Sequence, residues 1–185
     1  MRFRPPCTSG WPGDRHRAVV CRMIFAAAMA AGPLLTGCSP ALNWRVVPLG
    51  PMNAFLPCKP DHAQRRVTLA QTSVMMDMVG CEADGALYAV SHVQLADPKA
   101  VEAMVQAWRS ATLGNMHAGD VPAPPDLGTT GVQVLEVKGT RPDGTPVQAA
   151  LSWRVSGPDI YQLAVFATTL TPERTETLFT QSRIR

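Results

Sequence analysis

The strongest constraint on the fold is a strict alternation of side chains between residues 147 and 155. Apolar side chains stand at every second position, namely Val147, Ala149, Leu151, Trp153 and Val155, and Gln148, Ala150, Ser152 and Arg154 lie between them. Successive side chains of a β-strand point to opposite faces, so this period of two predicts a strand with one apolar face. The chain must therefore build a sheet and cover that face with another layer.

Similar, shorter runs predict seven further strands, at 43–47, 54–56, 64–69, 72–80, 87–95, 131–138 and 160–167. The runs 64–69 and 72–80 are expected to pair as a hairpin around Ala70-Gln71, so that the numbers of paired residues sum to about 141. In the last run, Tyr161, Leu163 and Val165 would share one face of the sheet.

The clearest helix is predicted between residues 97 and 115. Asp97 is a good N-cap, Pro98 suits the first helical position, and Gly114-Asn115 supplies a stop. The apolar residues that recur at helical spacing, together with one threonine, are Val101, Met104, Val105, Trp108 and Thr112. These residues are expected to form the buried face of the helix.

A second helix is predicted near the end of the sequence, with Thr171 as its cap, Pro172 at its first position and Leu178 on its inner face. Residues 117–131, rich in proline and glycine, are expected to be a loop. The order of strands, helix, strands and helix predicts the α+β class: an antiparallel β-sheet with two main helices packed on it. A length of 185 residues suits one domain, which we place at 43–185.

An apolar run of 13 residues, Met23–Leu35, precedes this domain. A membrane-spanning helix needs about 20 apolar residues, so the run is too short to cross a bilayer. Five arginines and one aspartate lie in residues 1–37, which gives this segment a net charge of +4. A basic segment followed by a short apolar run is typical of an export signal, so residues 1–37 are expected to be a signal peptide. A helix of the folded domain is the alternative.

The run ends at Leu35-Thr36-Gly37-Cys38, which resembles the lipobox of bacterial lipoprotein precursors. The resemblance implies cleavage before Cys38, diacylglycerol on its thiol and an acyl group on its amine. Three acyl chains would anchor the protein firmly to a membrane, with 38–42 as a short tether. Ser39 in the next position implies the outer membrane, facing the periplasm. Ordinary signal cleavage without lipid is the alternative.

Parts of the remaining chain resemble the PsbP-like α-β-α sandwich, found in a photosystem II extrinsic protein and in many small bacterial lipoproteins. The similar stretches are Phe55-Leu56-Pro57-Cys58-Lys59-Pro60, Tyr88-Ala89-Val90, residues 160–165 and residues 178–182. The resemblance implies helices on an antiparallel sheet and an accessory role in assembly. It implies no functional residue, because the group shares a fold more than a chemistry.

Charge argues against a nucleic-acid partner. The whole chain has a net charge of +3, but residues 38–185 hold 12 basic and 13 acidic side chains, a net charge of −1. The basic character therefore belongs to residues 1–37, and the domain has no basic stripe that could follow a phosphate backbone.

Two cysteines, Cys58 and Cys81, remain in the domain once Cys38 carries lipid. In an exported domain such a pair favours a disulfide. Their numbers sum to 139, close to the sum expected for the 64–80 hairpin, so both would lie near its open end. Two inert buried thiols are the alternative.

Methionines and histidines give little support for a metal site. The stretch Met75-Met76-Asp77-Met78 contains soft ligands that suit Cu(I). However, Met76 and Met78 share a strand face with Val74, where methionine is ordinary core filler. The histidines His62, His92 and His117 have no ligand-pair spacing. We expect no metal and no cofactor, and a buried or half-buried structural role for His92.

No catalytic residue is expected either. The carboxylates Asp77, Glu82, Asp84, Glu102, Glu136, Glu173 and Glu176 are scattered singly along the chain. No spacing implies acid–base work, and no glycine-rich loop could cradle a phosphate. Trp44, Trp108 and Trp153 fall in regular elements and are expected in the core.

Together these features predict a lipid-anchored cell-envelope lipoprotein of non-enzymatic binding or assembly-accessory type. Its partners would be the membrane, through the lipid on Cys38, and an envelope protein. An apolar or aromatic patch near 115–131, beside the proline-rich residues 121–125, would suit such a protein. The alternative is a periplasmic hydrolase or a copper-handling protein whose functional residues are dispersed in the sequence.

Overall fold

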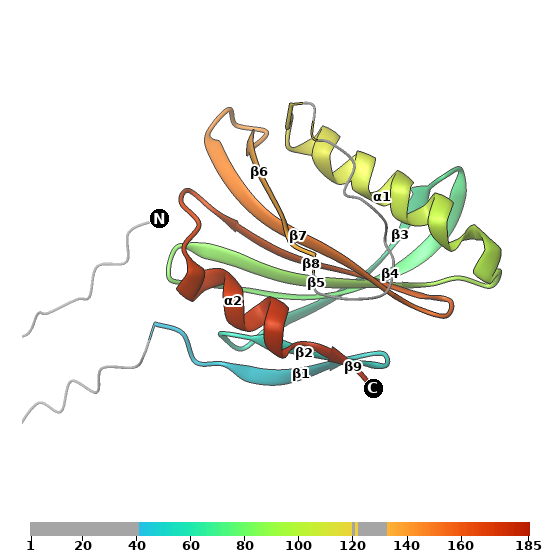
Figure 1. Ribbon diagram of the computed structural model, residues 1–185, viewed down its shortest axis with the longest axis horizontal. Coiled ribbons are helices and arrows are strands. Elements are labelled where there is room, and N and C mark those ends of the chain that lie inside the picture. The colour runs from blue at the N-terminus through green and yellow to red at the C-terminus, as the bar shows by residue number, and fades with distance from the viewer. Residues whose placement is uncertain (1–40, 120, 122–132) are drawn as a thin grey trace, which may run out of the picture. The chain divides into compact units, whose positions relative to one another are not determined.

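The computed structural model describes residues 41–119, 121 and 133–185, and all of them belong to one compact unit (Figure 1). Its centre is a six-stranded sheet in which every neighbouring pair of strands is antiparallel. From edge to edge the strands are β3 (Asp61–Leu69), β4 (Thr72–Ala83), β5 (Ala86–Gln94), β8 (Asp159–Ala167), β7 (Pro146–Ser156) and β6 (Leu135–Thr140). The antiparallel sheet predicted from the alternating patterns is therefore confirmed.

A second, three-stranded sheet lies against one face of the first. It consists of β1 (Arg45–Leu49), β2 (Met52–Leu56) and β9 (Arg183–Ile184), in that order and all antiparallel. The first two strands were expected from the sequence, but β9 was not. It has only two residues, and it pairs with β2 because the end of the preceding helix places it there: the backbone N–H of Phe55 donates a hydrogen bond to Ser182 Oγ at 2.9 Å.

The first helical segment begins at Pro98 as predicted, but it opens with a 3₁₀ turn, and Gly114-Asn115 lie inside the helix rather than after it. The Asp97 carboxylate accepts a hydrogen bond from the backbone N–H of Lys99 at 2.9 Å and caps a 3₁₀ turn, η1 (Pro98–Ala100). This turn leads into α1 (Val101–Asn115). Gly114-Asn115 does not stop the helix but forms its last residues. The chain reverses at His117, whose φ of 48° is in the left-handed region.

The two helices cover opposite faces of the six-stranded sheet (Figure 1). On one face, α1 buries Met104, Val105 and Trp108 as predicted. On the other, α2 (Pro172–Gln181) packs beside the three-stranded sheet and buries Leu178 and Phe179. Both predicted helices are thus present, and the α+β class is confirmed.

Strand β7 contributes side chains to both faces of the central sheet. The alternating apolar residues share one face as predicted, and Val147, Ala149, Leu151 and Trp153 pack on the side that α1 covers. The polar residues between them hold α2: the Arg154 guanidinium donates hydrogen bonds to the carbonyls of Ser182 and Phe179, at the C-terminal end of that helix. Carbonyls in the last turn of a helix have no partner within the helix, so the half-buried Arg154 cation satisfies two of them.

The β3–β4 hairpin has the predicted register. Asp61 pairs with Gly80 and Leu69 with Thr72, so the numbers of paired residues sum to 141. Ala70 and Gln71 form the turn with φ of 47° and 59°. Two left-handed residues make a turn whose twist matches that of the flanking strands, although neither residue is glycine.

Strand β6 was predicted at 131–138 but lies at Leu135–Thr140. Its position is decided by contact with the end of α1, because the backbone N–H of Thr140 donates a hydrogen bond to the Met116 carbonyl at 2.7 Å. A Cβ at position 139 would lie 2.2 Å from that same oxygen, so only glycine fits there. The alternation pattern alone does not predict this contact.

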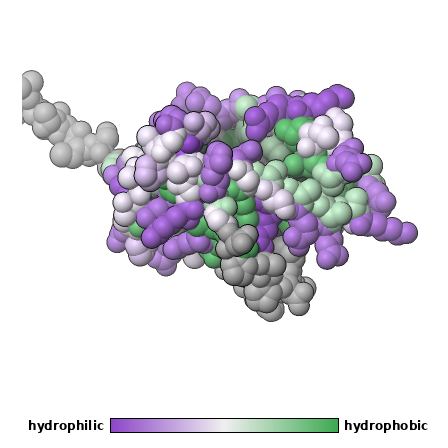
Figure 2. Space-filling model, turned by 90° about the horizontal axis from the view of Figure 1, so that it is seen from above, coloured by the Kyte–Doolittle hydropathy of each residue, from purple (hydrophilic) through white to green (hydrophobic). Residues whose placement is uncertain are grey.

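The α1 side of the domain is shown in Figure 2. Hydrophobic residues gather in the middle and on the right of this view, among hydrophilic ones. Partly buried side chains on this side, including Val67, Leu69 and Val101, pack against the core under α1. None of the helices in the described part of the chain is long and apolar enough to cross a membrane.

Candidate functional site

The predicted lipid-attachment residue, Cys38, lies outside the described residues, as do the whole predicted signal peptide 1–37 and the first part of the tether. The candidate features that the structure does describe are a disulfide, a buried polar cluster and several scattered polar side chains.

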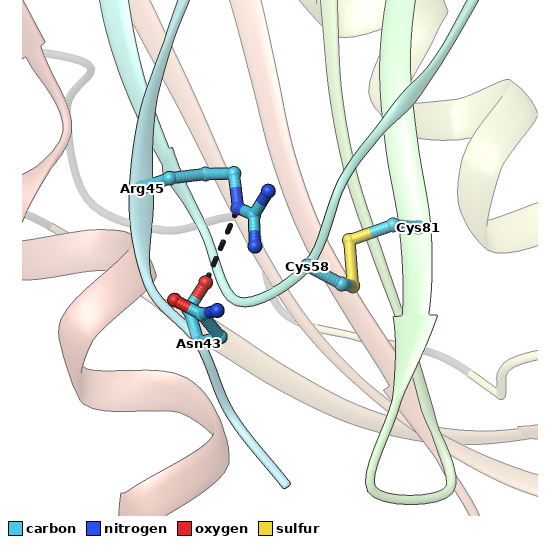
Figure 3. Close-up of a disulfide and its surroundings, with 4 residues drawn as sticks. All are labelled: Asn43, Arg45, Cys58 and Cys81. Carbon is cyan, nitrogen blue, oxygen red and sulfur yellow. Dashed lines mark hydrogen bonds between the residues drawn. A yellow bond between two sulfur atoms is a disulfide. The ribbon is translucent and has the colours of Figure 1, made fainter. Parts of the chain in front are cut away.

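Cys58 and Cys81 form a disulfide, which confirms the predicted pairing (Figure 3). Their Cα atoms lie 6.0 Å apart and are separated by 23 positions in the sequence. Cys58 lies between β2 and β3, whereas Cys81 belongs to β4 and is buried in the core between the two sheets. The bridge therefore ties the segment that leaves the small sheet to the central sheet.

A polar cluster centred on His92 lies on the face that the small sheet covers. His92 and Tyr161 are directly opposite each other on β5 and β8, and their rings stack with centroids 4.6 Å apart. Asp159, the first residue of β8, places its Oδ1 atom 2.7 Å from His92 Nε2 and also accepts a hydrogen bond from Gln94 Nε2 at 3.3 Å. The sheet register brings these side chains together.

The β1–β2 turn closes over this cluster. Gly50 has a φ of +53°, and a Cβ at this position would lie 3.0 Å from His92 Cε1. Two hydrogen bonds from Arg185 hold the turn in place. Its backbone N–H donates to the Pro51 carbonyl, and its guanidinium donates to the Gly50 carbonyl. His92 and Asp159 are each only 7% exposed. An imidazole oriented by a carboxylate can act as a base, but here a solute would first have to displace the turn.

Sequence analysis predicted a buried or half-buried His92 but not its partner. Asp159 comes just before the strand predicted at 160–167, and in the structure it is the first residue of β8. Sixty-seven positions separate the two residues. They meet only because β5 and β8 are neighbours in the sheet, and no signal in the sequence specifies that order.

The other two histidines and the methionine-rich stretch are not brought together. His62 lies on β3 and His117 follows α1, and both are exposed. Met76 is buried under α1, which confirms its predicted place in the core, while Met75 is 42% exposed. Among the described residues, no group of three or more histidine, cysteine, aspartate or glutamate side chains is placed to hold a metal ion.

The carboxylates that were named as scattered also stay apart. Asp77 accepts a hydrogen bond from Gln64 across the β3–β4 hairpin at 2.6 Å. Asp84, in the β4–β5 turn, pairs with Arg174 at 2.9 Å and so ties that turn to α2. Both are structural contacts at the surface, and each joins two elements of the fold.

The tryptophans lie in or against the core. Trp108 is buried, and Trp153 packs between the two apolar clusters on the α1 side. Trp44 is half-buried and meets Tyr88 edge-on, with ring centroids 5.8 Å apart. The proline-rich residues beside which a binding patch was predicted lie, after Val121, outside the described part of the chain.

Both tyrosines of the chain, Tyr88 and Tyr161, are fully buried, and we expect them to resist ionisation. Burial raises the pKa of Tyr88. Burial, together with the nearby Asp159 carboxylate, raises the pKa of Tyr161 to about 12. In the unfolded chain both phenols titrate near pH 10. The stabilisation from keeping them neutral is therefore complete below about pH 10 and is lost as the pH rises toward 12.

The measurement is tyrosinate absorbance against pH, with circular dichroism recorded in parallel. We expect ionisation of both phenols to coincide with alkaline unfolding, and a control in denaturant to titrate near pH 10. A folded protein with tyrosinate already formed at that pH would contradict the structure.

Comparison with models of known protein families, with curated protein sequences and with solved structures finds no match to this chain.

Proposed function

We propose that this chain is a lipid-anchored lipoprotein of the cell envelope, whose domain binds or assists other envelope components without catalysis. The observation that carries the proposal is the Cys58–Cys81 disulfide. Disulfides persist in oxidising compartments such as the bacterial periplasm and are rare in the cytosol. A bridge that joins the two sheets of the domain therefore supports export.

The start of the chain supports a lipid anchor. An apolar run too short to span a bilayer ends at Leu35-Thr36-Gly37-Cys38, the lipobox-like motif. The first strand, β1, begins at Arg45, only seven positions after Cys38. Even fully extended, seven residues reach no more than about 25 Å, so an acylated Cys38 would keep the domain close to the membrane surface.

The surroundings of His92 argue against a catalytic role for this residue. The imidazole and the Asp159 carboxylate are the titratable pair that the fold brings together, and the Gly50 turn covers them. Asp77 and Asp84 lie elsewhere, each engaged with a neighbouring element. A solute in solvent therefore has no direct access to the imidazole that Asp159 orients.

We also propose that the domain is a PsbP-like α-β-α sandwich. Support comes from the antiparallel six-stranded sheet with α1 on one face and α2 on the other. The small sheet β1–β2–β9, beside α2, is an addition that the resemblance did not imply. An accessory role in assembly is proposed by analogy with that group.

The proposal is tested with the full chain expressed in a Gram-negative host. Cells are fed a labelled fatty acid, and their membranes are separated on a density gradient. We expect label on the protein and recovery in the outer-membrane fraction. An unlabelled protein in the soluble periplasmic fraction would refute the anchor, and one in the cytosol would refute export. Crosslinking in the same membranes then identifies the protein partner.

A further inference from the structure

The outward face of the small sheet carries a mixed apolar and basic surface. Residues that are directly paired in neighbouring strands lie on the same face of a sheet. Val46 pairs with Phe55, Pro48 pairs with Asn53, and Asn53 pairs with Arg183. The inward positions between them, such as Val47 and Ala54, are buried in the core. We call the outward set, Val46, Pro48, Asn53, Phe55 and Arg183, the outer patch.

Apolar side chains in the outer patch are unusually open to solvent. Val46 is 54% exposed, more than any other large hydrophobic residue in the described part of the chain. Phe55, directly across from it, is partly exposed and does not belong to the buried core. A single exposed valine needs no explanation, but an exposed valine paired with a partly exposed phenylalanine, on a face that also carries Arg183, does.

The segments that form the small sheet contain basic residues and no acidic ones. Residues 41–57 and 182–185, which contain the whole small sheet, carry Arg45, Arg183 and Arg185 and no acidic residue. The other residues of 38–185 hold nine basic and 13 acidic side chains. The neighbouring helix α2 adds Glu173 and Glu176, together with Arg174. The small sheet therefore has a local net charge of +3, whereas the other residues of 38–185 have a net charge of −4.

We propose that the outer patch rests on the anionic headgroups of the bilayer that holds the lipid of Cys38. The inference depends on the proposed lipid anchor. The small sheet contains the first strand after the anchor, and Arg45 lies within about 25 Å of Cys38 along the chain. Exposed apolar side chains beside an arginine, on a sheet without acidic residues, suit the boundary between headgroups and acyl chains. Contact there fixes which side of the domain faces the periplasm.

The test places a fluorescent label on the patch in the lipidated protein. In the processed chain Cys38 is acylated and Cys58–Cys81 is bridged, so Val46→Cys introduces one free thiol. Val155→Cys is the matched control: Val155 is 40% exposed, at a position of β7 that faces the α1 side. Both labelled proteins are incorporated into vesicles that contain quencher lipids, made from phosphatidylcholine alone or mixed with phosphatidylglycerol.

We expect the label at position 46 to be quenched at least about twofold more than the label at 155 in vesicles with phosphatidylglycerol, and less so at high salt. Arg183→Glu should reduce the difference, whereas Lys99→Glu, an equal charge change beside α1, should not. Equal quenching of both labels in protein that floats with the vesicles would overturn the docking but leave the anchor intact. Protein that does not float would overturn the anchor, and the docking with it.

A protein partner on the patch is a separate outcome. If quenching is equal in vesicles but a crosslinker at position 46 captures a protein in native membranes, the patch binds that protein and the lipid proposal is wrong.

Discussion

Replacing Cys38 with serine is expected to abolish acyl labelling of the protein and to remove it from the outer-membrane fraction. A serine hydroxyl does not replace the thiol that accepts the diacylglycerol. Without diacylglycerol on residue 38, the signal peptide is not cleaved before this residue, so its amine is not exposed for acylation. Acyl chains supply the membrane affinity, because each buried methylene contributes about 0.8 kcal/mol and two chains already suffice for stable anchoring. Fractionation and fatty-acid labelling of the variant measure the effect.

The matched control is Cys21→Ser, which makes the same chemical change in the predicted signal peptide. This variant should be labelled and fractionated like the wild type. Intact mass should show the processed length for the control and, for Cys38→Ser, the mass of an unacylated chain. Unchanged membrane partitioning and fatty-acid labelling of Cys38→Ser would refute the lipoprotein proposal.

Removing the disulfide is expected to lower the free energy of unfolding by about 3 kcal/mol, because the bridge closes a loop of 23 positions in the unfolded chain. For a domain of this size that corresponds to a fall of about 10 °C in Tm. The double variant Cys58→Ala/Cys81→Ala is preferable to single replacements, because a single replacement would leave one unpaired thiol, which at the partly exposed Cys58 could react. Denaturant unfolding of the variant and the wild type measures the difference.

Reductant provides the control for this prediction. It should destabilise the wild type to the level of the double variant and leave the double variant unchanged. Intact mass after alkylation should show no modified Cys58 or Cys81 until the wild type is reduced. Free alkylation without reductant would contradict the bridge in the structure and would remove the main support for export.

Much of the fold could be predicted because its signals are local. The alternation at 147–155 specified a strand with an apolar face, and the short turn at Ala70-Gln71 determined the register of a whole hairpin. Asp97 and Pro98 identified the start of a helix in the same way. Each of these signals acts within a few residues, so neighbours in the sequence are sufficient to express it.

The polar cluster could not be predicted, because it depends on strand order. His92 and Asp159 belong to strands that are neighbours only in space. The Gly50 turn that covers them comes from the other sheet, and Arg185 holds that turn in place. No sequence pattern predicts which turn will cover which histidine. The sequence could therefore predict that His92 is buried, but not which residue it contacts.

By itself, the sequence determined the α+β class, the two helices and the disulfide pairing. These follow from the periodicity of side chains, from capping residues and from the short spacing of two cysteines around one hairpin. The tertiary structure alone decided that β1, β2 and β9 form a separate sheet with an exposed basic and apolar face. The physical reason is that pairing of distant strands depends on loop closure and packing of the whole chain, which local patterns do not encode.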